Sequence, residues 1–431
     1  MDKSVECAGR FMLGEPHSER TAVLEEVHAR PFHALRVPAR LMHFAMMTTP
    51  AEAQAGWSAL VDLCHDCKLP VPAVGAKHHR VQLDQESLRW EQHGEFATYT
   101  FEMTAMVGDP FQPALRDVSS RFSRLAMKGR HLVSTDVQIL APNDDIELSE
   151  IFDPSSLAAS TVHGGRALVA TDFRVRDDFV RYLVVDRGLD AASMGALSVR
   201  LLEIETYRLL ALLGLPEAQR LAPDVAEAEK NLAEISEVMA SANGLESDNH
   251  LLNRLTALAA RSEAAATSTA FRFGACRAYD GIVQQRLVAI GEEQIGTLPT
   301  LAAFLSRRMS PAMRTCYVLQ ERQRELSRKL SRTANLLRTR VDVEIERQNR
   351  DLLRSMNNRT RLQLRLQHTV EGLSIAAISY YVVGLGGYVF KAAYETKLLR
   401  IDPAVATAAF VPIAILIIAM MLRRIRRDHR D

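Results

Sequence analysis

The residues best suited to chemistry lie on one expected strand, where Arg89, Glu91 and His93 occupy every second position. Alternate strand residues share one face of a sheet, so Leu88 and Trp90 would point to the other face. A guanidinium, a carboxylate and an imidazole on one face can bind an anionic ligand or act as an acid–base pair. The alternative is that this face is the solvent-exposed side of an antiparallel sheet.

A second candidate anion site is the string His28-Ala29-Arg30-Pro31-Phe32. Proline disfavours the helical conformation of the residue before it, so an expected helix over residues 24–28 ends here. His28 and Arg30 then bind either an anion or the unpaired groups at the end of that helix. We therefore count both among the candidate ligand-binding residues.

The cysteines provide weaker evidence for a site. Cys64 and Cys67 form a CxxC string with His78 and His79 beyond it, a spacing that loosely resembles a zinc site. The sequence has no second CxxC, so a redox pair and incidental thiols are the alternatives, and we predict no bound metal or cofactor. Five scattered cysteines do not form a disulfide framework and are typical of a reducing compartment.

Common catalytic motifs are absent from the sequence, which contains no GxGxxG, P-loop, GxSxG or HExxH string. We therefore predict that the protein is not an enzyme and assign no catalytic residues. A membrane-tethered hydrolase that uses His28, Glu91 and His93 is a weaker alternative. The 53 basic and 52 acidic residues give a net charge of +1, which excludes nucleic-acid binding through bulk charge.

An N-terminal α+β domain over residues 1–190 must position these side chains. Strands are expected at 41–47, 81–93, 95–103, 131–140, 167–175 and 179–185, with a helix at 50–67 and a loop at 141–160. Paired hairpins with a few helices are typical of a domain built on an antiparallel sheet.

From residue 191 onward the sequence predicts only helices. A helical domain over 191–298 has expected helices at 193–213, 217–242 and 246–290. The expected breaks are at Pro216, Pro223, Gly244, Gly291, Gly296 and Pro299. The acids Glu203 and Glu205 lie in the first helix beside arginines, so pairs three residues apart explain them without a functional role.

A long basic stalk helix is expected over 299–371, because residues 312–371 contain neither glycine nor proline. Apolar residues recur there every eleven positions, a period of 3.67 residues per turn that predicts a nearly straight, self-associating coiled-coil stalk. The main series is Leu319, Leu330, Val341 and Leu352. We therefore predict a homo-oligomer that forms through this helix, with intrahelical pairs such as Glu321–Arg324 and Glu325–Arg328 on its surface.

The C-terminal end predicts a transmembrane hairpin over 372–422. Residues 372–390 and 403–422 are two uncharged runs, each long enough as a helix to cross about 30 Å of hydrocarbon. Basic residues flank the hairpin on its outer ends and predict two cytoplasmic termini and contacts with lipid head groups. These residues are Arg359, Arg361 and Arg365 before it, and Arg423, Arg424, Arg426 and Arg427 in the basic tail 423–431.

The first span carries glycine, serine and tyrosine residues, which the second span lacks. They include Ser374, Ser379, Tyr380, Gly384, Gly386 and Gly387. Small residues let membrane helices approach closely, so a helix–helix contact is the simpler interpretation. The alternative is that this face lines a polar pathway for a small ion.

Several strings together resemble a bacterial family of membrane-anchored proteins known only as a domain of unknown function, the one numbered 3422. The carrying segments are EVHARPF (26–32), LRWEQHGEFATYTF (88–101), TDFRV (171–175), RLLEIETYRLLALLGLP (200–216), FRFGACRAYDGIV (271–283), LLRTRVDVEIERQNRDLL (336–353) and LQLRLQHTVEGLSIAAISYYVVGLGGY (362–388). The resemblance implies anchoring in the bacterial inner membrane and implies no catalytic residues.

The order of parts also resembles that of CorA-type magnesium channels, in which an α+β cytosolic domain is followed by a long helix and two C-terminal spans. The Gly-Met-Asn signature of those channels is missing from this sequence, which has Gly386-Gly387-Tyr388 in that neighbourhood. We therefore expect an oligomeric membrane protein with a cytosolic sensing or scaffolding domain. The alternative is a CorA-like cation channel whose first span lines the pore.

Overall fold

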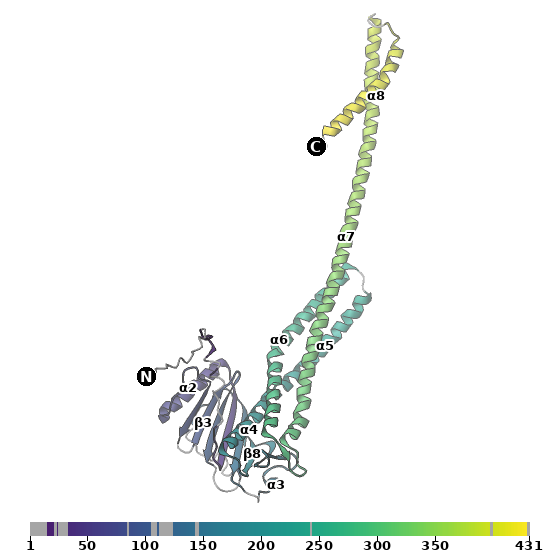
Figure 1. Ribbon diagram of the computed structural model, residues 1–431. Coiled ribbons are helices and arrows are strands. Elements are labelled where there is room, and N and C mark those ends of the chain that lie inside the picture. Colours follow the sequence, from purple (N-terminus) through teal and green to yellow (C-terminus); the bar gives the residue numbers. More distant parts are fainter. Residues whose placement is uncertain are drawn as a thin grey trace, which may run out of the picture. The chain divides into compact units, whose positions relative to one another are not determined.

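The structure is a computed structural model that describes residues 15–20, 24, 33–83, 86–104, 110–111, 124–142, 146–241, 244–396 and 400–428. The chain divides into two compact units, whose elements are labelled in Figure 1. The first unit contains residues 1–235 and 255–331 and holds the sheet. The second unit contains residues 236–254 and 332–431 and holds the apolar end of the chain.

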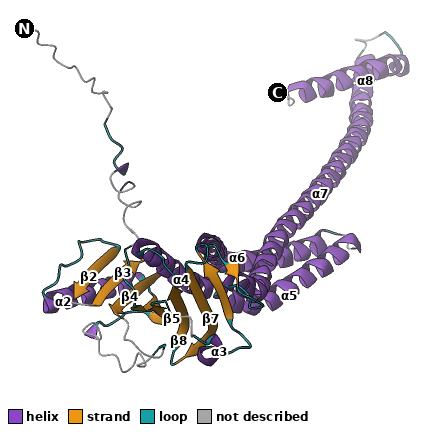
Figure 2. Cartoon of the chain, turned by 60° about the horizontal axis from the view of Figure 1, so that its bottom comes forward, coloured by secondary structure: helices purple, strands orange, loops and turns teal. Residues whose placement is uncertain are grey.

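The first unit is built on a nine-stranded sheet, seen as one continuous layer in Figure 2. Its strand order is β2-β3-β4-β1-β5-β8-β7-β6-β9. The strands are β1 (Ala39–Met47), β2 (His78–Leu83), β3 (Glu86–Gln92), β4 (Phe96–Thr104), β5 (Arg130–Leu140), β6 (Ala158–Val162), β7 (Ala167–Arg176), β8 (Phe179–Asp186) and β9 (Glu293–Gln294). Among the described strands, neighbours are antiparallel except β5 and β8, which run parallel. The predicted α+β class is therefore confirmed.

The first expected hairpin contains one strand more than predicted. The segment 81–93 forms parts of two strands, β2 and β3, which pair with each other before β3 pairs with β4. The strands β6 and β9 lie in segments that were not expected to be extended. β6 has only five residues and does not alternate between apolar and polar side chains, and β9 has two residues that pair only with β6, so neither shows a clear period of two.

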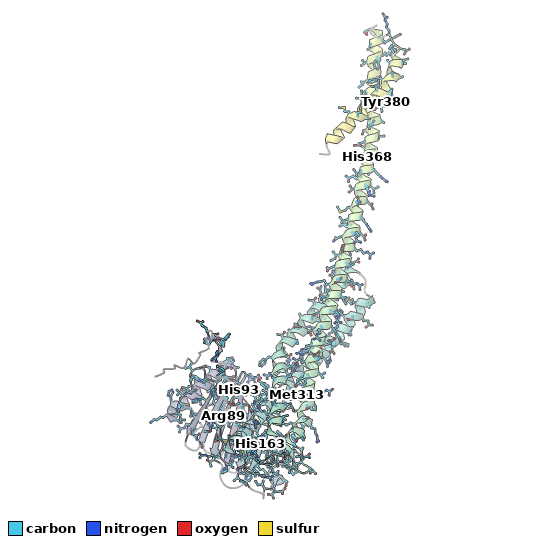
Figure 3. The ribbon with its side chains drawn as sticks, viewed as in Figure 1. Arg89, His93, His163, Met313, His368 and Tyr380 are labelled. Atoms are coloured by element: carbon cyan, nitrogen blue, oxygen red, sulfur yellow. The ribbon has the colours of Figure 1, made fainter. Side chains whose placement is uncertain are left out.

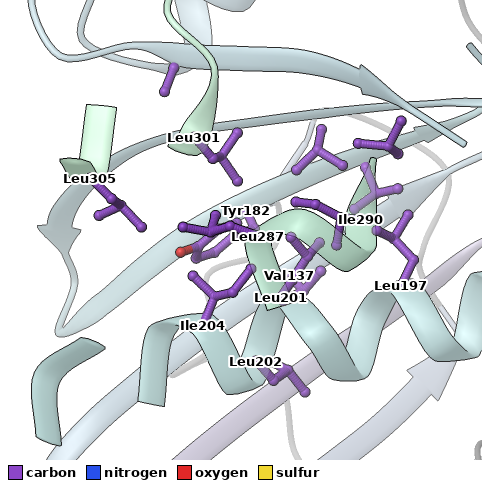
Figure 4. Close-up of a cluster of buried hydrophobic side chains, with 14 of the residues drawn as sticks. Val137, Tyr182, Leu197, Leu201, Leu202, Ile204, Leu287, Ile290, Leu301 and Leu305 are labelled. Carbon is purple, nitrogen blue, oxygen red and sulfur yellow. The ribbon is translucent and has the colours of Figure 1, made fainter. Parts of the chain in front are cut away.

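The two faces of the sheet have different cores. The helix α2 (Pro50–Cys67), which begins with a capping box between Thr49 and Glu52, packs Leu60 and Leu63 against Leu88 and Trp90. On the opposite face, α4 (Ala191–Leu212), α6 (Leu245–Ile290) and the start of α7 (Leu301–Glu395) cover Val137 and Tyr182, as Figure 4 shows. A further short helix, α3 (Leu148–Ile151), follows β5.

α4 lies very close to the chain that precedes β1. The backbone N–H of Leu35 donates to the carbonyl oxygen of Ala191 at 2.8 Å. A Cβ atom added at Gly195 would lie 1.8 Å from the carbonyl oxygen of His33. Position 195 must therefore be glycine for α4 to approach the sheet in this way.

The helices α5 (Gly214–Ser241), α6 and α7 pack against one another in the first unit. Arg322 of α7 pairs with Glu229 of α5 at 2.7 Å, and Arg277 of α6 bonds to Gln320 of α7. The predicted break at Pro223 is wrong, because α5 continues through it. Leu221 and Val225 are buried on either side of this proline, so tertiary packing offsets the hydrogen bond that it removes.

α7 is a single helix of 95 residues that runs from Leu301 through the stalk segment into the first apolar span. The apolar residues that recur every eleven positions change from buried to exposed along this helix. Leu319, Leu330 and Val341 are buried within the chain, whereas Leu352 is 60% exposed. The predicted intrahelical pairs Glu321–Arg324 and Glu325–Arg328 are confirmed, at 3.6 and 3.7 Å.

Two helices are long and apolar enough to span a membrane: α7, and the segment Pro403–Met421 of α8 (Pro403–Asp428). Within the second unit, α8 contacts the end of α7, since Phe390 and Phe410 meet edge to face at 5.6 Å. These two helices are consistent with membrane association.

Candidate functional site: a histidine-lined cavity between the sheet and helix α4

A cavity of about 550 Å³ lies between α4 and the strands β1 to β4. Its wall contains five histidines, three arginines and two glutamates, together with threonine and aromatic side chains. The ionisable residues are His33, His43, His78, His79, His93, Arg80, Arg89, Arg286, Glu91 and Glu203. Figure 3 labels Arg89 and His93 in the part of the chain that holds the sheet.

The strand register explains why these side chains meet. Arg89 pairs with Thr100 of β4, and Thr100 in turn pairs with His43 of β1. Glu91 pairs with Thr98 on one side and with His78 on the other. Cross-strand partners point to the same face, so one polar face extends over four neighbouring strands.

This polar face is only partly open to water. α4 covers it with Leu202, Thr206 and Tyr207, and α6 contributes Arg286. The apolar cluster that α4 forms with the sheet instead lies over β5 and β8, through residues such as Val137 and Tyr182. The helix therefore closes one side of a concave polar surface and leaves a cleft above β2 and β3.

His43 forms the buried floor of the cavity and is 4% exposed. Its Nε2 lies 3.0 Å from Thr206 Oγ1, which already donates to the carbonyl oxygen of Leu202. Thr206 therefore accepts from an Nε2–H group, and His43 Nδ1 accepts from the Thr100 hydroxyl at 2.8 Å. Burial, with the positive charge of Arg89 and then His93 nearby, lowers the pKa of His43 to about 3. His43 is therefore neutral and structural at neutral pH.

Arg89, Glu91 and Thr98 form the part of the wall with unsatisfied polar groups. Arg89 Nε is buried and has no hydrogen-bond partner among the described residues, since Glu91 Oε2 lies 3.9 Å away. Thr98 is 3% exposed, and its hydroxyl likewise lacks a partner in the described part of the chain. A buried polar group without a partner costs about 1–3 kcal/mol, so these two groups are suited to bind a ligand.

The other two arginines of the wall are held by carboxylates. Arg80 donates to Glu102 at 2.9 Å, and Arg286 donates to Glu203 at 2.6 Å. Burial and the charges of Arg80 and Arg89 lower the pKa of His33, which favours its neutral form. Arg89 is thus the wall arginine with the most capacity to bind an added anion.

One end of the cavity is aromatic. The ring of His93 stacks on Phe96 at 4.3 Å, and Phe96 meets Tyr207 edge to face at 6.0 Å. Behind them, Tyr279 donates to Glu95 at 2.8 Å, and burial together with Glu95 raises the pKa of Tyr279. This end can hold a planar or apolar part of a ligand.

The structure brings three of the predicted site residues together, because Arg89, Glu91 and His93 all line the cavity. His28 and Arg30 lie outside the described residues.

The expected CxxC and histidine pair are divided between the two sides of the sheet. Cys64 is buried in the core beneath α2, where burial raises the pKa of its thiol. His78 pairs with Glu91 and faces the cavity on the opposite side, whereas His79 pairs with Trp90 on the α2 side, where its Nε2 donates to the carbonyl oxygen of Pro70. The described residues contain no cluster of three metal-binding side chains.

Much of the wall was not predicted from the sequence. His43 was expected only as part of a strand, and neither His33 nor Thr98 was singled out. Glu203 was expected to pair three residues away, whereas it bonds to Arg286 in another helix. The i,i+3 explanation is confirmed for Glu205, which pairs with Arg208. The available signal was the position of His43 within the apolar run 41–47.

The predicted membrane residues lie in the second unit. Gly386 faces α8, because an added Cβ would lie 2.7 Å from the Phe410 ring, and Gly387 lies beside Thr407. Ser379 is buried, whereas Tyr380 is 77% exposed and Gly384 is open. Ser374 donates to the carbonyl oxygen four residues before it.

The predicted lipid-contacting arginines are exposed where the structure describes them. This holds for Arg359, Arg361 and Arg365 of α7. The side chains of Arg423, Arg424, Arg426 and Arg427 lie outside the described part of the chain.

The fold and the cavity define an α+β protein with a polar cavity and two candidate membrane helices. The family described as Protein of unknown function (DUF3422) matches residues 15–429. The chain belongs to this family, as the sequence strings predicted. Two further comparisons, with curated proteins and with solved structures, found no match.

Proposed function

We propose that this protein is a membrane-anchored binding protein whose sheet domain takes up a small anionic ligand in the histidine-lined cavity. The observation that carries the proposal is the pair of buried, unsatisfied donors on its wall, Arg89 Nε and the Thr98 hydroxyl. A carboxylate or phosphate oxygen satisfies both groups, and a hydrogen bond to a charged partner is roughly twice as strong as a neutral one.

The volume and the chemistry of the wall support a ligand rather than bulk water. About 550 Å³ is within the range of small-molecule sites, which combine apolar walls with a few fixed polar groups. Glu91 lies beside Arg89 without a hydrogen bond to it, and its carboxylate can accept a hydrogen bond from a hydroxyl or amine group of the ligand. The aromatic end at His93 and Phe96 provides an apolar wall.

The C-terminal hairpin supports an anchoring role. In the topology that we propose, the chain crosses the bacterial inner membrane twice, both termini lie in the cytoplasm, and arginines contact the lipid head groups. Gly386 and Gly387 lie against α8, which supports a helix–helix contact for this face of the first span. The pore-lining role of a CorA-like channel stays a prediction.

The stalk supports self-association over a shorter stretch than the sequence predicted. Leu330, Leu337 and Val341 are already buried within the chain, so they are not available to a second copy. Ile345, Leu352 and Met356 continue the apolar series and are 42%, 60% and 57% exposed. We propose that this exposed continuation of α7 makes the contact between copies.

Ligand-dependent stabilisation of the purified full-length protein tests the binding function. Inorganic phosphate, succinate and citrate are added separately, and unfolding of the sheet domain is followed by tryptophan fluorescence. A ligand at about 100 times its dissociation constant stabilises the folded state by about 2.7 kcal/mol. We expect at least one anion to stabilise both the wild-type protein (the parent) and an Arg187→Gln control. Arg187 is exposed and does not line the cavity.

The Arg89→Gln and Thr98→Val variants should lose this stabilisation while their unfolding without ligand stays cooperative. Equal stabilisation of the parent and Arg89→Gln by every anion would refute the assignment of the site.

A further inference from the structure

A second cavity, of about 320 Å³, lies where β7, α4 and the first turns of α7 meet in the first unit. It shares no lining residue with the histidine-lined cavity. Its wall contains three arginines and two phenylalanines beside apolar residues of α4 and α7. We refer to it as the arginine cavity, after Arg174, Arg208 and Arg308.

The aromatic residues of this cavity belong to a four-layer stack. Phe173 and Phe304 lie almost parallel, with their ring centroids 4.8 Å apart. Arg208 covers Phe173 at 5.3 Å, and Arg308 covers Phe304 at 3.9 Å. A guanidinium that lies flat on a ring keeps the N–H groups at its edge free to bind an anion.

Phe173 is held in an unusual conformation. It has a φ of +54°, in a bulge of β7 where the pairing with β8 shifts between Thr171 and Val175. Asp172 braces the bulge by accepting from the backbone N–H groups of Asp153 and Arg174. A bulky residue with positive φ is strained, and such strain is concentrated at binding sites.

The charges of the arginine cavity are unevenly compensated. Arg174 pairs with Asp153 at 2.8 Å and also donates to the hydroxyls of Ser155 and Ser156, and Arg208 pairs with the buried Glu205. The one carboxylate in the wall, Asp172, is bonded to Arg176 outside it. Arg308 has no carboxylate partner among the described residues, so its charge remains available at the mouth of the cavity.

We propose that the arginine cavity is a second binding site, which takes a phosphate monoester with a small apolar group. The phosphate lies against Arg308, the wall arginine without a carboxylate partner among the described residues, and its guanidinium N–H groups match the phosphate oxygens. The apolar group lies against Leu212 and Met309, which line the same cavity. An occupant would join the β7 bulge to the start of α7, the helix that continues into the first apolar span.

Calorimetric titration with phenyl phosphate tests this site. The full-length protein carries Arg89→Gln and is held in nanodiscs of uncharged phosphatidylcholine, so that the histidine-lined cavity and the lipid surface do not compete. We expect saturable binding of one phenyl phosphate per chain, and none of the neutral analogue benzyl alcohol. The absence of saturable binding up to about 10 mM phenyl phosphate would overturn the proposal.

A matched pair of variants separates the site from general charge. Arg308→Gln removes the uncompensated guanidinium and should weaken binding by roughly tenfold or more. Arg307→Gln removes the adjacent exposed arginine, which does not line the cavity, and should leave the affinity unchanged. Equal weakening in both variants would contradict the proposal, because bulk charge would then explain the binding.

Competition identifies the source of the phosphate. Glycerol phosphate represents a soluble ester, and dioctanoyl phosphatidate represents a lipid head group with the same phosphate chemistry. Displacement of phenyl phosphate by either compound supports the site, and the compound that binds at least tenfold more tightly indicates the source. Failure of both to displace it would overturn the phosphate monoester class. Because Arg89 is already replaced, these results do not depend on the histidine-lined cavity.

Discussion

Acidification should destabilise the sheet domain through His43. This imidazole is buried and hydrogen-bonded as a neutral group, with a pKa of about 3 in the fold against an ordinary value of 6.5. Between these two values the unfolded chain binds a proton that the folded chain does not. The stability that His43 provides is therefore fully present above about pH 6.5 and is lost as the pH falls toward 3.

The magnitude follows from the same pKa difference. Each pH unit below 6.5 removes about 1.4 kcal/mol, so acidification from about pH 7.5 to about pH 4.5 removes about 2.7 kcal/mol from the free energy of unfolding. Replacement of His43 by glutamine removes the titrating group but keeps a donor for Thr206 and an acceptor for Thr100. The variant should therefore lose about 2.7 kcal/mol less than the parent over this range.

The assay is urea unfolding of the full-length protein in detergent, followed by tryptophan fluorescence at several pH values. The chain has two tryptophans, Trp57 on α2 and Trp90 on β3, which pack in the same core of the sheet domain. Their signal therefore reports this domain and not the apolar helices. Equal loss of stability in the parent and in His43→Gln would refute the buried, neutral state of His43.

Three substitutions test the packing of the fold. Gly195→Ala should prevent the sheet domain from folding, at a cost above about 4 kcal/mol, and the native tryptophan signal should be missing, because the new Cβ overlaps backbone. Asp136→Asn should cost about 3–5 kcal/mol in urea unfolding, because it breaks a buried ion pair with Arg40. Gly386→Leu should lower the thermal midpoint seen by circular dichroism, by about 1–3 kcal/mol in stability, whereas Gly384→Leu should leave it unchanged because that position is open.

Local patterns predicted much of the fold because they act over a few residues. The helix over 50–67 has a proline at its first position and a capping box, and its bounds are those predicted. The turn at 176–178 between β7 and β8 was also found, since polar residues there separate two β-branched runs. The break expected at Pro223 is wrong because helix propensity reflects only local chemistry, while burial on both sides of the proline keeps α5 intact.

The candidate site was only partly predictable because it is assembled across the sheet. The period of two placed Arg89, Glu91 and His93 on one face, but it did not indicate what covers that face. The cover comes from α4, more than 100 residues later in the chain, and His43 joins through strand register. The stalk shows the same limit, since the eleven-residue stripe is clear in the sequence, but part of it packs within the chain.

Identification of the small molecules that the purified protein carries tests directly whether the histidine-lined cavity binds an anion. Full-length protein is purified in detergent and denatured, and the released compounds are quantified by mass spectrometry. We expect about one anionic compound per chain in the wild-type protein and in Arg187→Gln, and its loss in Arg89→Gln. A parent without any bound anion, or an Arg89→Gln variant that carries as much as the parent, would contradict a ligand in the histidine-lined cavity.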